Sequence, residues 1–214
     1  LGVGVYRTDT GATPVFADVH LDTVAIDPMA AQAAVTSSTR AVIGVHLYGR
    51  PLDTEALVAA VGVPVVEDCA QSHGATSRVA GAAAAYSFYP TKNLGGIGDG
   101  GAVVTDDLAL AERVRRLRAH GASQQYVHVE ISQNHRLSEL EAAWLLVTLP
   151  FLAADNARRR DVAAAYRSAA PHLAWQAEHP HHVHHLAVVR AANRDALRGH
   201  LGAHGVGTAV HYPL

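Results

Sequence analysis

The sequence predicts an α/β fold with a largely parallel sheet. Short β-branched runs alternate with Ala-rich segments of helical spacing along the first half of the chain, and this alternation is typical of layered α/β domains. After Pro171 a smaller α+β pattern follows. We therefore expect a large domain at residues 1–160 and the start of a small domain at 161–214.

Five segments of the large domain are expected to be strands, and three segments between them are expected to be helices. β-branched and small apolar residues predict mostly buried strands at 14–17, 41–46, 63–66, 85–88 and 102–105. Helical spacing predicts helices at 29–35, 55–61 and 108–118. Asp106 and Asp107 precede the last of these, where negative charge favours a helix start.

From Leu137 the pattern predicts a long helix. Ser138 and Glu141 have the spacing of a reciprocal cap, in which each side chain accepts from the other residue's backbone amide. Pro150 should end or kink this helix because proline has no amide hydrogen, and a second helix is expected at 153–167. The small domain is then predicted to contain a strand at 184–190, a helix at 194–204 and a strand at 208–211.

Composition favours a globular protein whose partners are small molecules or copies of itself. The 214 residues are 49% hydrophobic and 17% charged, which is ordinary for a folded domain. A net charge of −2 argues against binding to nucleic acid or an anionic membrane, and no apolar stretch reaches the roughly 20 residues of a membrane span. Cys69 alone cannot form an internal disulfide, which fits a cytoplasmic location.

An apolar strand leads directly into acidic, amide and imidazole groups at residues 65–74, VVEDCAQSHG. Strand ends of this kind face the ligand crevice of open α/β sheets. Asp68 could hold the proton on a ring nitrogen there, as an electron-sink pyridine cofactor requires. The alternative is that Asp68 caps a helix or pairs with a surface arginine, because Asp residues are common at such positions.

Lys92 stands alone among aromatic residues and glycines at residues 86–101, YSFYPTKNLGGIGDGG. A lysine amine attacks an aldehyde only when unprotonated, and partial desolvation lowers its pKa, so Lys92 suits a Schiff-base role. Ser87, five positions earlier, offers a hydroxyl to a phosphate. The alternative is a solvated loop lysine. The glycine spacing also matches a dinucleotide fingerprint, which we reject because Gly101 is expected to open a strand and not a helix.

A cluster of histidines raises the possibility of a metal site. Packed imidazoles can bind a transition metal, but no carboxylate or Cys completes a ligand set of fixed geometry. Strand alternation would also place His182 and His184 opposite His185. No metal site is therefore predicted in the cluster, which comprises His179, His181, His182, His184 and His185.

These segments together resemble the DegT/DnrJ/StrS family of sugar aminotransferases, which use pyridoxal 5'-phosphate and have fold type I. The segments that match in the family order are 11–18, 45–49, 67–74, 87–101, 134–137 and 211–213. The resemblance implies part of a three-layer α/β/α large domain and part of a small α+β C-terminal domain. We expect the chain to be truncated at both ends, because nothing upstream of Gly11 supplies the family's phosphate loop or ring-stacking aromatic residue.

The resemblance also implies residue roles at the cofactor. Lys92 would hold pyridoxal 5'-phosphate as a Schiff base and shuttle the proton, while Asp68 would pair with the pyridinium nitrogen. Gln71 would lie near the ring's phenolic oxygen, and Ser87 would bind the phosphate. Asn134 would reach the phosphate of a neighbouring subunit, which implies a homodimer with shared active sites.

His211 and Tyr212 are expected at the substrate mouth, with a structural histidine as the alternative for His211. The implied reaction moves an amino group from a donor such as glutamate to a keto group on a nucleotide-linked sugar, in polysaccharide or amino-sugar biosynthesis. Lys92 favours transamination over the related dehydratases, which carry His at this position. The alternative function is a non-catalytic homologue that pairs with a full-length copy.

Overall fold

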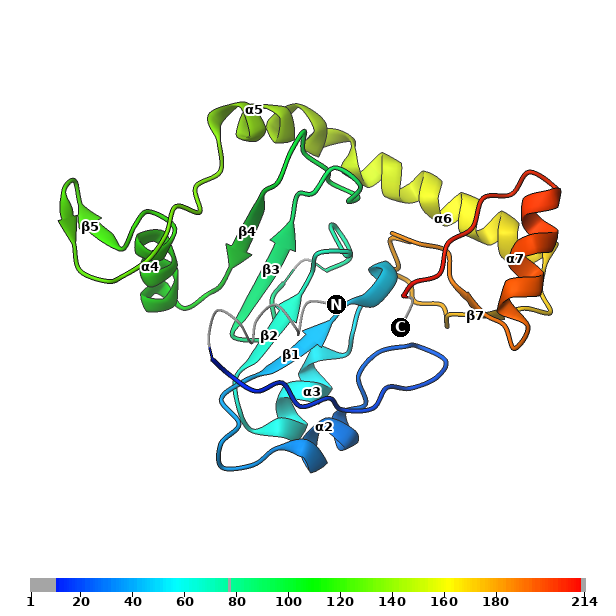
Figure 1. The fold of residues 1–214 in the computed structure, drawn as a ribbon, viewed down its shortest axis with the longest axis horizontal. Helices are drawn as coiled ribbons and strands as arrows, with labels where there is room; N and C mark the ends of the chain where they lie inside the picture. The colour runs from blue at the N-terminus through cyan, green and yellow to red at the C-terminus, as the bar shows by residue number, and fades with distance from the viewer. Residues whose placement is uncertain (1–10, 77, 213–214) are drawn as a thin grey trace.

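A four-stranded mixed sheet lies at the centre of the protein. The computed structural model describes residues 11–76 and 78–212. Strands β1 (Val42–Val45), β2 (Val65–Asp68) and β3 (Ala83–Ser87) are parallel, and β4 (Gly101–Val104) is antiparallel to β3 (Figure 1). No helix separates β3 from β4, and a connection without a crossover helix returns the chain antiparallel. The prediction of an α/β fold is confirmed, with an antiparallel edge strand.

Helices α2 (Pro28–Ala34) and α3 (Thr54–Val61) form the main core with the sheet. Each begins after an aspartate whose carboxylate accepts from a backbone amide: Asp27 from Met29 at 2.8 Å and Asp53 from Ala56 at 3.0 Å. α3 ends at Gly62, whose φ of 63° suits glycine. The buried core residues are Ala31, Leu52, Leu57, Val61 and Val65.

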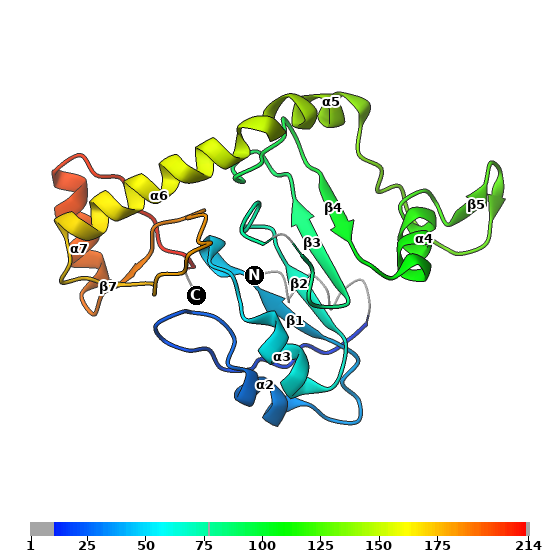
Figure 2. The ribbon, with the colours of Figure 1, turned by 180° about the vertical axis from the view of Figure 1, so that it is seen from behind.

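The remaining elements extend from the sheet in two directions (Figures 1 and 2). Helix α4 (Leu108–Leu117) and the hairpin of β5 (Ala122–Gln124) and β6 (Val127–His128) lie at one end. Helix α7 (Arg194–Ala203) and the pair β7 (Ala174–Trp175) and β8 (Val189–Arg190) lie at the other. Between them run α5 (Glu139–Thr148), the short η2 (Leu149–Phe151) and α6 (Leu152–Ala169). The predicted domain boundary at residue 160 falls inside α6 and stays a prediction.

Two predicted strands are absent and a third is much shorter than predicted. Residues 14–17 form no strand, and Val15 and Phe16 are largely exposed. The strand predicted at 184–190 shrinks to β8, because His184 has a φ of 41° and its amide donates to His182 Nδ1 at 2.9 Å. Residues 208–211 are irregular, and the carbonyl of His211 accepts from a tyrosine side chain instead of a neighbouring strand.

Helix α5 begins after Ser138 as predicted, but only half of the reciprocal cap is present. Ser138 Oγ accepts from the Glu141 amide at 3.2 Å. The Glu141 carboxylate turns away from the helix start and is buried against Gly96, which leaves room for it because glycine has no side chain. The prediction for Pro150 is confirmed, since this residue lies in η2, where α5 gives way to α6.

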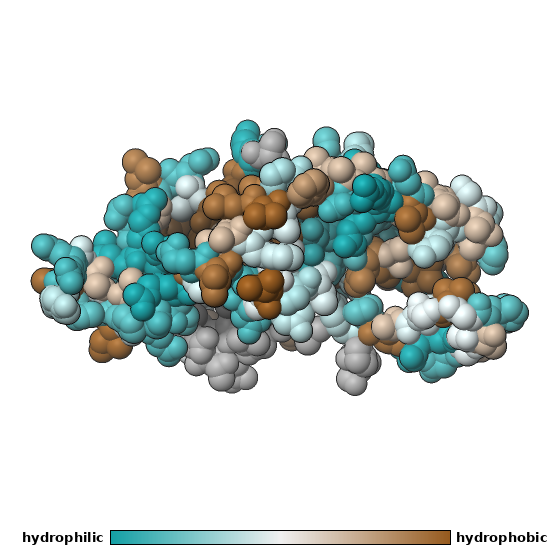
Figure 3. Space-filling model, turned by 90° about the horizontal axis from the view of Figure 1, so that it is seen from above, coloured by the Kyte–Doolittle hydropathy of each residue, from teal (hydrophilic) through white to brown (hydrophobic). Residues whose placement is uncertain are grey.

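Apolar side chains gather on the outer surface of α5. Figure 3 looks down on α5 and α6 and shows them grouped near α5. The exposed residues of α5 are Leu140, Trp144, Leu146 and Val147, and Leu149 and Phe151 follow in η2. Exposed apolar patches often mark interaction surfaces. Among the described residues, no helix combines the length and apolar character needed to cross a membrane.

A substitution of Leu57 measures how much the core around α3 contributes to stability. The Leu57 side chain is fully buried, whereas the adjacent Val58 is 38% exposed. We expect Leu57→Ala to lower the free energy of unfolding by about 2–5 kcal/mol, because it leaves a cavity, and Val58→Ala to have a much smaller effect. Denaturant unfolding of both variants measures the difference, and similar losses would contradict this account of the core.

Candidate active site

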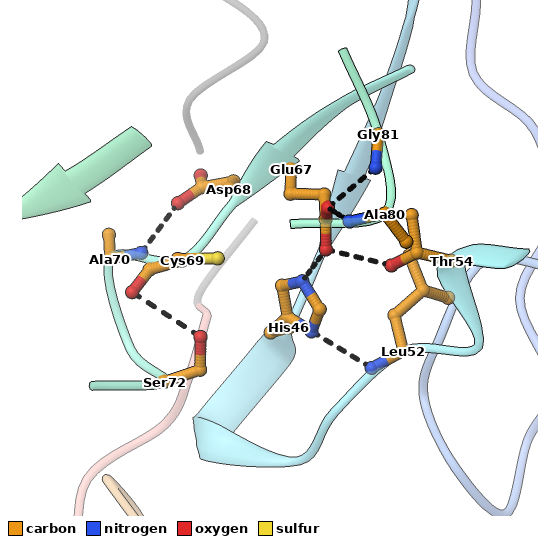
Figure 4. Close-up of polar contacts among 10 residues, drawn as sticks. All are labelled: His46, Leu52, Thr54, Glu67, Asp68, Cys69, Ala70, Ser72, Ala80 and Gly81. Atoms are coloured by element: carbon orange, nitrogen blue, oxygen red, sulfur yellow. Dashed lines mark hydrogen bonds and ion pairs between the residues drawn. The ribbon is translucent and has the colours of Figure 1, made fainter. Parts of the chain in front are cut away.

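Strand β2 sends two adjacent carboxylates to opposite faces of the sheet. Figure 4 shows Glu67 pointing towards Thr54 and His46, while Asp68 lies on the other side of the strand, as the two-residue period of a strand requires. The Asp68 carboxylate accepts from the Ala70 amide at 3.0 Å. No helix begins at Asp68, and the part of the chain that the structure describes gives it no arginine partner. The Ala70 amide is therefore the hydrogen-bond partner of the Asp68 carboxylate, which has no ion pair among the described residues.

Glu67 is the centre of a buried hydrogen-bond network (Figure 4). One carboxylate oxygen accepts from His46 Nε2 and Thr54 Oγ1 at 2.9 Å, and the other from the amides of Ala80 and Gly81 at 2.8 Å. Burial alone would raise the pKa of Glu67, but the four hydrogen bonds lower it to about 2. The network joins the end of β1, the start of α3 and the segment before β3 to β2.

Lys92 lies in a compact turn after β3. Its amide donates to the Tyr89 carbonyl at 2.9 Å, and the Gly96 amide donates to the Phe88 carbonyl at 2.7 Å. Burial lowers the pKa of the Lys92 amine, and the nearby charge of Asp68 partly opposes this shift. The half-buried amine differs from a solvated loop lysine. The sequence also holds a signal that pattern reasoning missed, because Lys92 is the only lysine in the chain.

Two neutral histidines lie near Lys92. His73 is buried beside the rings of Tyr86 and Phe88, at centroid distances of 5.4 and 6.0 Å. Burial, followed by the positive charge of Lys92, lowers the pKa values of His73 and His185 to about 4. Both imidazoles are therefore uncharged at neutral pH, and neither adds a positive charge beside Lys92.

Ser87 is the last residue of β3. Its hydroxyl oxygen accepts from the Tyr89 amide at 3.3 Å, so its proton remains available for donation to a ligand oxygen. The end of β3 thus positions Ser87, and the turn that follows directly positions Lys92.

Gln71 is joined to the two residues predicted at the substrate mouth. Its Oε1 accepts from the Tyr48 amide at 2.6 Å, and its Nε2 donates to the Tyr212 hydroxyl at 2.9 Å. The Tyr48 hydroxyl in turn donates to the His211 carbonyl at 2.6 Å. Tyr48 belongs to η1 (Leu47–Gly49) and has a φ of 62°. No role was predicted for Tyr48, although the segment 45–49 is one of those that match the family.

Asn134 lies apart from this group. It pairs with Ala119, just beyond the end of α4, and its Oδ1 accepts from Arg136 Nε at 2.9 Å. The Asn134 side chain is exposed. An exposed position is compatible with the predicted contact to a second subunit, and that role stays a prediction.

The clustered histidines do not converge on one point. The rings of His182 and His184 stack at 3.7 Å, and His182 Nε2 lies 3.2 Å from Gln176 Oε1. His185 instead contacts Asn93. Among the described residues, the ligand atoms close enough for a metal are those of His46, Glu67 and Cys69. The hydrogen bonds of Glu67, and that of the Leu52 amide to His46 Nδ1 at 3.0 Å, already occupy two of these three groups, Glu67 and His46.

A groove opens on the α3 side of the sheet, away from Lys92. Its two arginines are engaged within the protein: Arg78 pairs with Glu55 at 3.4 Å, and Arg50 Nε donates to the Ala177 carbonyl at 2.9 Å. The groove lies against the buried Glu67 network, whereas Lys92 lies near Asp68, the last residue of β2, and we take the residues around Lys92 as the candidate site.

Comparison with known proteins gives consistent matches along the chain. The model of the DegT/DnrJ/EryC1/StrS aminotransferase family matches residues 7–214. A relative from Streptomyces venezuelae, dTDP-3-amino-3,4,6-trideoxy-alpha-D-glucose transaminase, is 45% identical over 218 residues, which cover 96% of this chain and 58% of the relative. The chain thus spans about three fifths of the length of that relative.

Two crystal structures have the same fold. S. venezuelae DesV in complex with a ketimine intermediate has a TM-score of 0.92 at 45% identity, over 98% of this chain and 60% of that chain. NtdA from Bacillus subtilis with bound cofactor PMP has a TM-score of 0.89 at 28% identity, over 96% of this chain and 51% of that chain. The predicted fold class, that of pyridoxal-phosphate-dependent transferases, is confirmed.

The Glu67 network makes stability depend on pH. Because the folded pKa of about 2 lies below the ordinary 4.5, Glu67 stabilises the fold above pH 4.5, and this contribution falls as pH decreases towards 2. We expect Glu67→Gln to cost about 1–3 kcal/mol at pH 7, since its amide group must face a donor, and to flatten this acid dependence.

Urea unfolding between pH 2 and 7 measures both effects. Glu55→Gln is the matched control, because Glu55 forms an exposed ion pair with Arg78 and exposed pairs contribute little. Parallel acid destabilisation of the wild-type and Glu67→Gln proteins would show that Glu67 is not the titrating group.

Proposed function

Because the chain belongs to the DegT/DnrJ/EryC1/StrS aminotransferase family, we propose that it binds pyridoxal 5'-phosphate through Lys92 and acts in the amination of a keto-sugar nucleotide. The observation that carries the proposal is that the Lys92 amine is partly buried and has a lowered pKa. Lys92 is the only lysine of the chain, and burial lowers its pKa while the Asp68 carboxylate lies near enough to act on its charge. This combination suits an amine that must react with an aldehyde.

The side chains around Lys92 fit the parts of this cofactor. Pyridoxal 5'-phosphate supplies, when bound, an aldehyde and an electron-withdrawing ring. Lys92 would bind the aldehyde carbon and later move the proton at the reacting carbon. Asp68, which lacks a cationic partner among the described residues, would keep a proton on the ring nitrogen. The Ser87 hydroxyl would donate to the phosphate, and Gln71 would lie beside the phenolic oxygen.

The substrate class follows from the relatives. The S. venezuelae relative is a transaminase whose name specifies a dTDP-linked amino sugar. The same chemistry in this protein requires an amino donor such as glutamate and a nucleotide-linked sugar with a keto group, in polysaccharide or amino-sugar biosynthesis. His211 and Tyr212 would contact this substrate, a role supported by their links to Tyr48 and Gln71, since Gln71 would lie beside the cofactor. Cys69, a single buried thiol, fits a protein that works in the cytoplasm.

Cofactor binding can be measured directly because only one lysine can react. We expect the purified chain mixed with pyridoxal 5'-phosphate to show the absorption band of a lysine adduct, and borohydride to fix the cofactor on Lys92 in peptide mapping. Lys92→Ala should lose both signals, since no other lysine can replace it.

Asp68→Asn tests the ring contact within the same experiment. It keeps the size of the side chain but cannot hold a protonated ring nitrogen, so the adduct band should shift or weaken. Flat spectra for the wild-type protein and Lys92→Ala alike would contradict the proposal and favour the alternative, a non-catalytic homologue that pairs with a full-length copy.

A homodimer with shared sites is the second part of the proposal. Asn134 is exposed and lies apart from Lys92, so it could serve the site of another subunit. The apolar outer surface of α5 offers side chains such as Leu140 and Val147 for burial between two copies, and twofold pairing is the commonest arrangement of such surfaces. The Asn134 amide would then donate to the phosphate bound beside the neighbour's Lys92.

Mixing two variants, each of which lacks a different part of the predicted site, tests whether the site is shared between subunits. Asn134→Ala alone should weaken cofactor affinity roughly tenfold, because a hydrogen bond to a charged phosphate is lost, and Lys92→Ala should form no adduct. A refolded mixture should regain a tight site, built from Lys92 of one chain and Asn134 of the other. Gln133→Ala, at the neighbouring exposed position, is the control. A mixture that binds no better than Asn134→Ala alone would argue against shared sites.

A further inference from the structure

The side chain of Asn93, next to Lys92, is bonded to segments far away in the sequence. Its Nδ2 donates to Asn156 Oδ1 in α6 and to the Val183 carbonyl, both at 2.9 Å. Its Oδ1 lies 3.1 Å from His185 Nδ1. The turn that carries Lys92 is thus attached both to α6 and to the His-rich segment, residues 179–185.

A second amide continues the network towards β2. Asn156 is buried, and its Nδ2 donates to the His73 carbonyl at 2.9 Å. His73 belongs to the segment that follows Asp68. One continuous set of hydrogen bonds therefore runs from the end of β2 through Asn156 and Asn93 to His185.

The direction of each hydrogen bond in this set is fixed. The carbonyls of His73 and Val183 only accept, so the Nδ2 groups of Asn156 and Asn93 must face them. The Oδ1 of Asn93 then faces His185 and needs a donor, which can only be Nδ1–H. His185 is kept uncharged by burial and by the charge of Lys92, so its single ring proton lies on Nδ1. Its Nε2 keeps a lone pair and has no hydrogen-bond partner among the described residues.

We propose that Asn93 is a positioning residue that fixes the Lys92 turn to α6 and to the His-rich segment, and that holds His185 in the Nδ1–H tautomer. This inference rests on the proposed function, because the geometry of the turn matters for a lysine that must reach an aldehyde. Hydrogen bonds of this kind restrict a side chain whose reaction depends on placement. The free Nε2 of His185 can then accept a hydrogen bond from a bound ligand near Lys92.

Asn93→Asp separates positioning from simple packing. Aspartate has the same shape and can still accept from His185, but it cannot donate to Asn156 or to Val183. We expect the Lys92 adduct with pyridoxal 5'-phosphate to form roughly ten- to a hundredfold more slowly. We also expect His185 to titrate at a higher pH, because a carboxylate replaces the neutral amide while Lys92, Arg159, His73 and His211 still act on the ring.

Nitrogen NMR of the imidazole rings in the cofactor-free protein provides the second readout. In the wild type, the His185 signals should show a proton on Nδ1 at neutral pH, and a proton on Nε2 would overturn the proposal whatever the variants do. Asn156→Asp is the second variant, since it loses the donor to His73 and should slow adduct formation if Asn93→Asp fails to fold. Asn193→Asp is the control, because Asn193 is exposed and its side chain makes no helix-capping hydrogen bond.

Adduct formation at the wild-type rate in folded Asn93→Asp would also overturn the proposal. The two claims fail in different ways. A wild-type protein that forms no adduct contradicts the proposed function, whereas the tautomer of His185 in the cofactor-free protein is decided without any cofactor.

Discussion

The burial of the Glu67 carboxylate is the constraint on which the rest of the structure depends. A charge in the protein interior is tolerated only when several donors surround it, and here the donors come from His46, Thr54 and the amides of Ala80 and Gly81. These groups belong to the end of β1, the start of α3 and the segment before β3, so satisfying one carboxylate aligns three neighbours on β2. Strand alternation then sends Asp68 to the opposite face.

Lys92 reaches the region of Asp68 because β3 runs beside β2 and ends in a tight turn. The charge of Asp68 acts on the Lys92 amine, but the ion pairs among the described residues do not include one between these two side chains. Burial favours the neutral amine and Asp68 favours the charged one, so the two effects oppose each other at a group whose reactivity depends on its protonation. The neighbouring histidines His73 and His185 stay uncharged at neutral pH because burial, and after it the positive charge of Lys92, lowers their pKa values.

Segments from the second half of the chain contact the turn that carries Lys92. The Glu141 carboxylate of α5 packs against Gly96, and Trp144 Nε1 of the same helix donates to the Gly95 carbonyl at 3.1 Å. α6 and the His-rich segment hold Asn93. The glycine-rich turn after Lys92 has few side chains of its own with which to pack, so its shape is set by elements that approach from outside. This explains why a local pattern, the Ser138 and Glu141 spacing, predicted a cap that the tertiary structure uses only in part.

By itself the sequence determined the α/β class, the helices predicted at 29–35, 55–61 and 108–118, which lie within one residue of α2, α3 and α4, and the candidates Lys92 and Asp68, because periodicity, capping residues and the chemistry of a strand end are local properties. It could not determine whether segments such as 14–17 or 208–211 find a strand partner, since pairing depends on distant backbone. Nor could it identify Tyr48, Asn156 or the tautomer of His185. Those features arise from hydrogen bonds between residues 63 to 163 positions apart, which only the folded chain brings within reach.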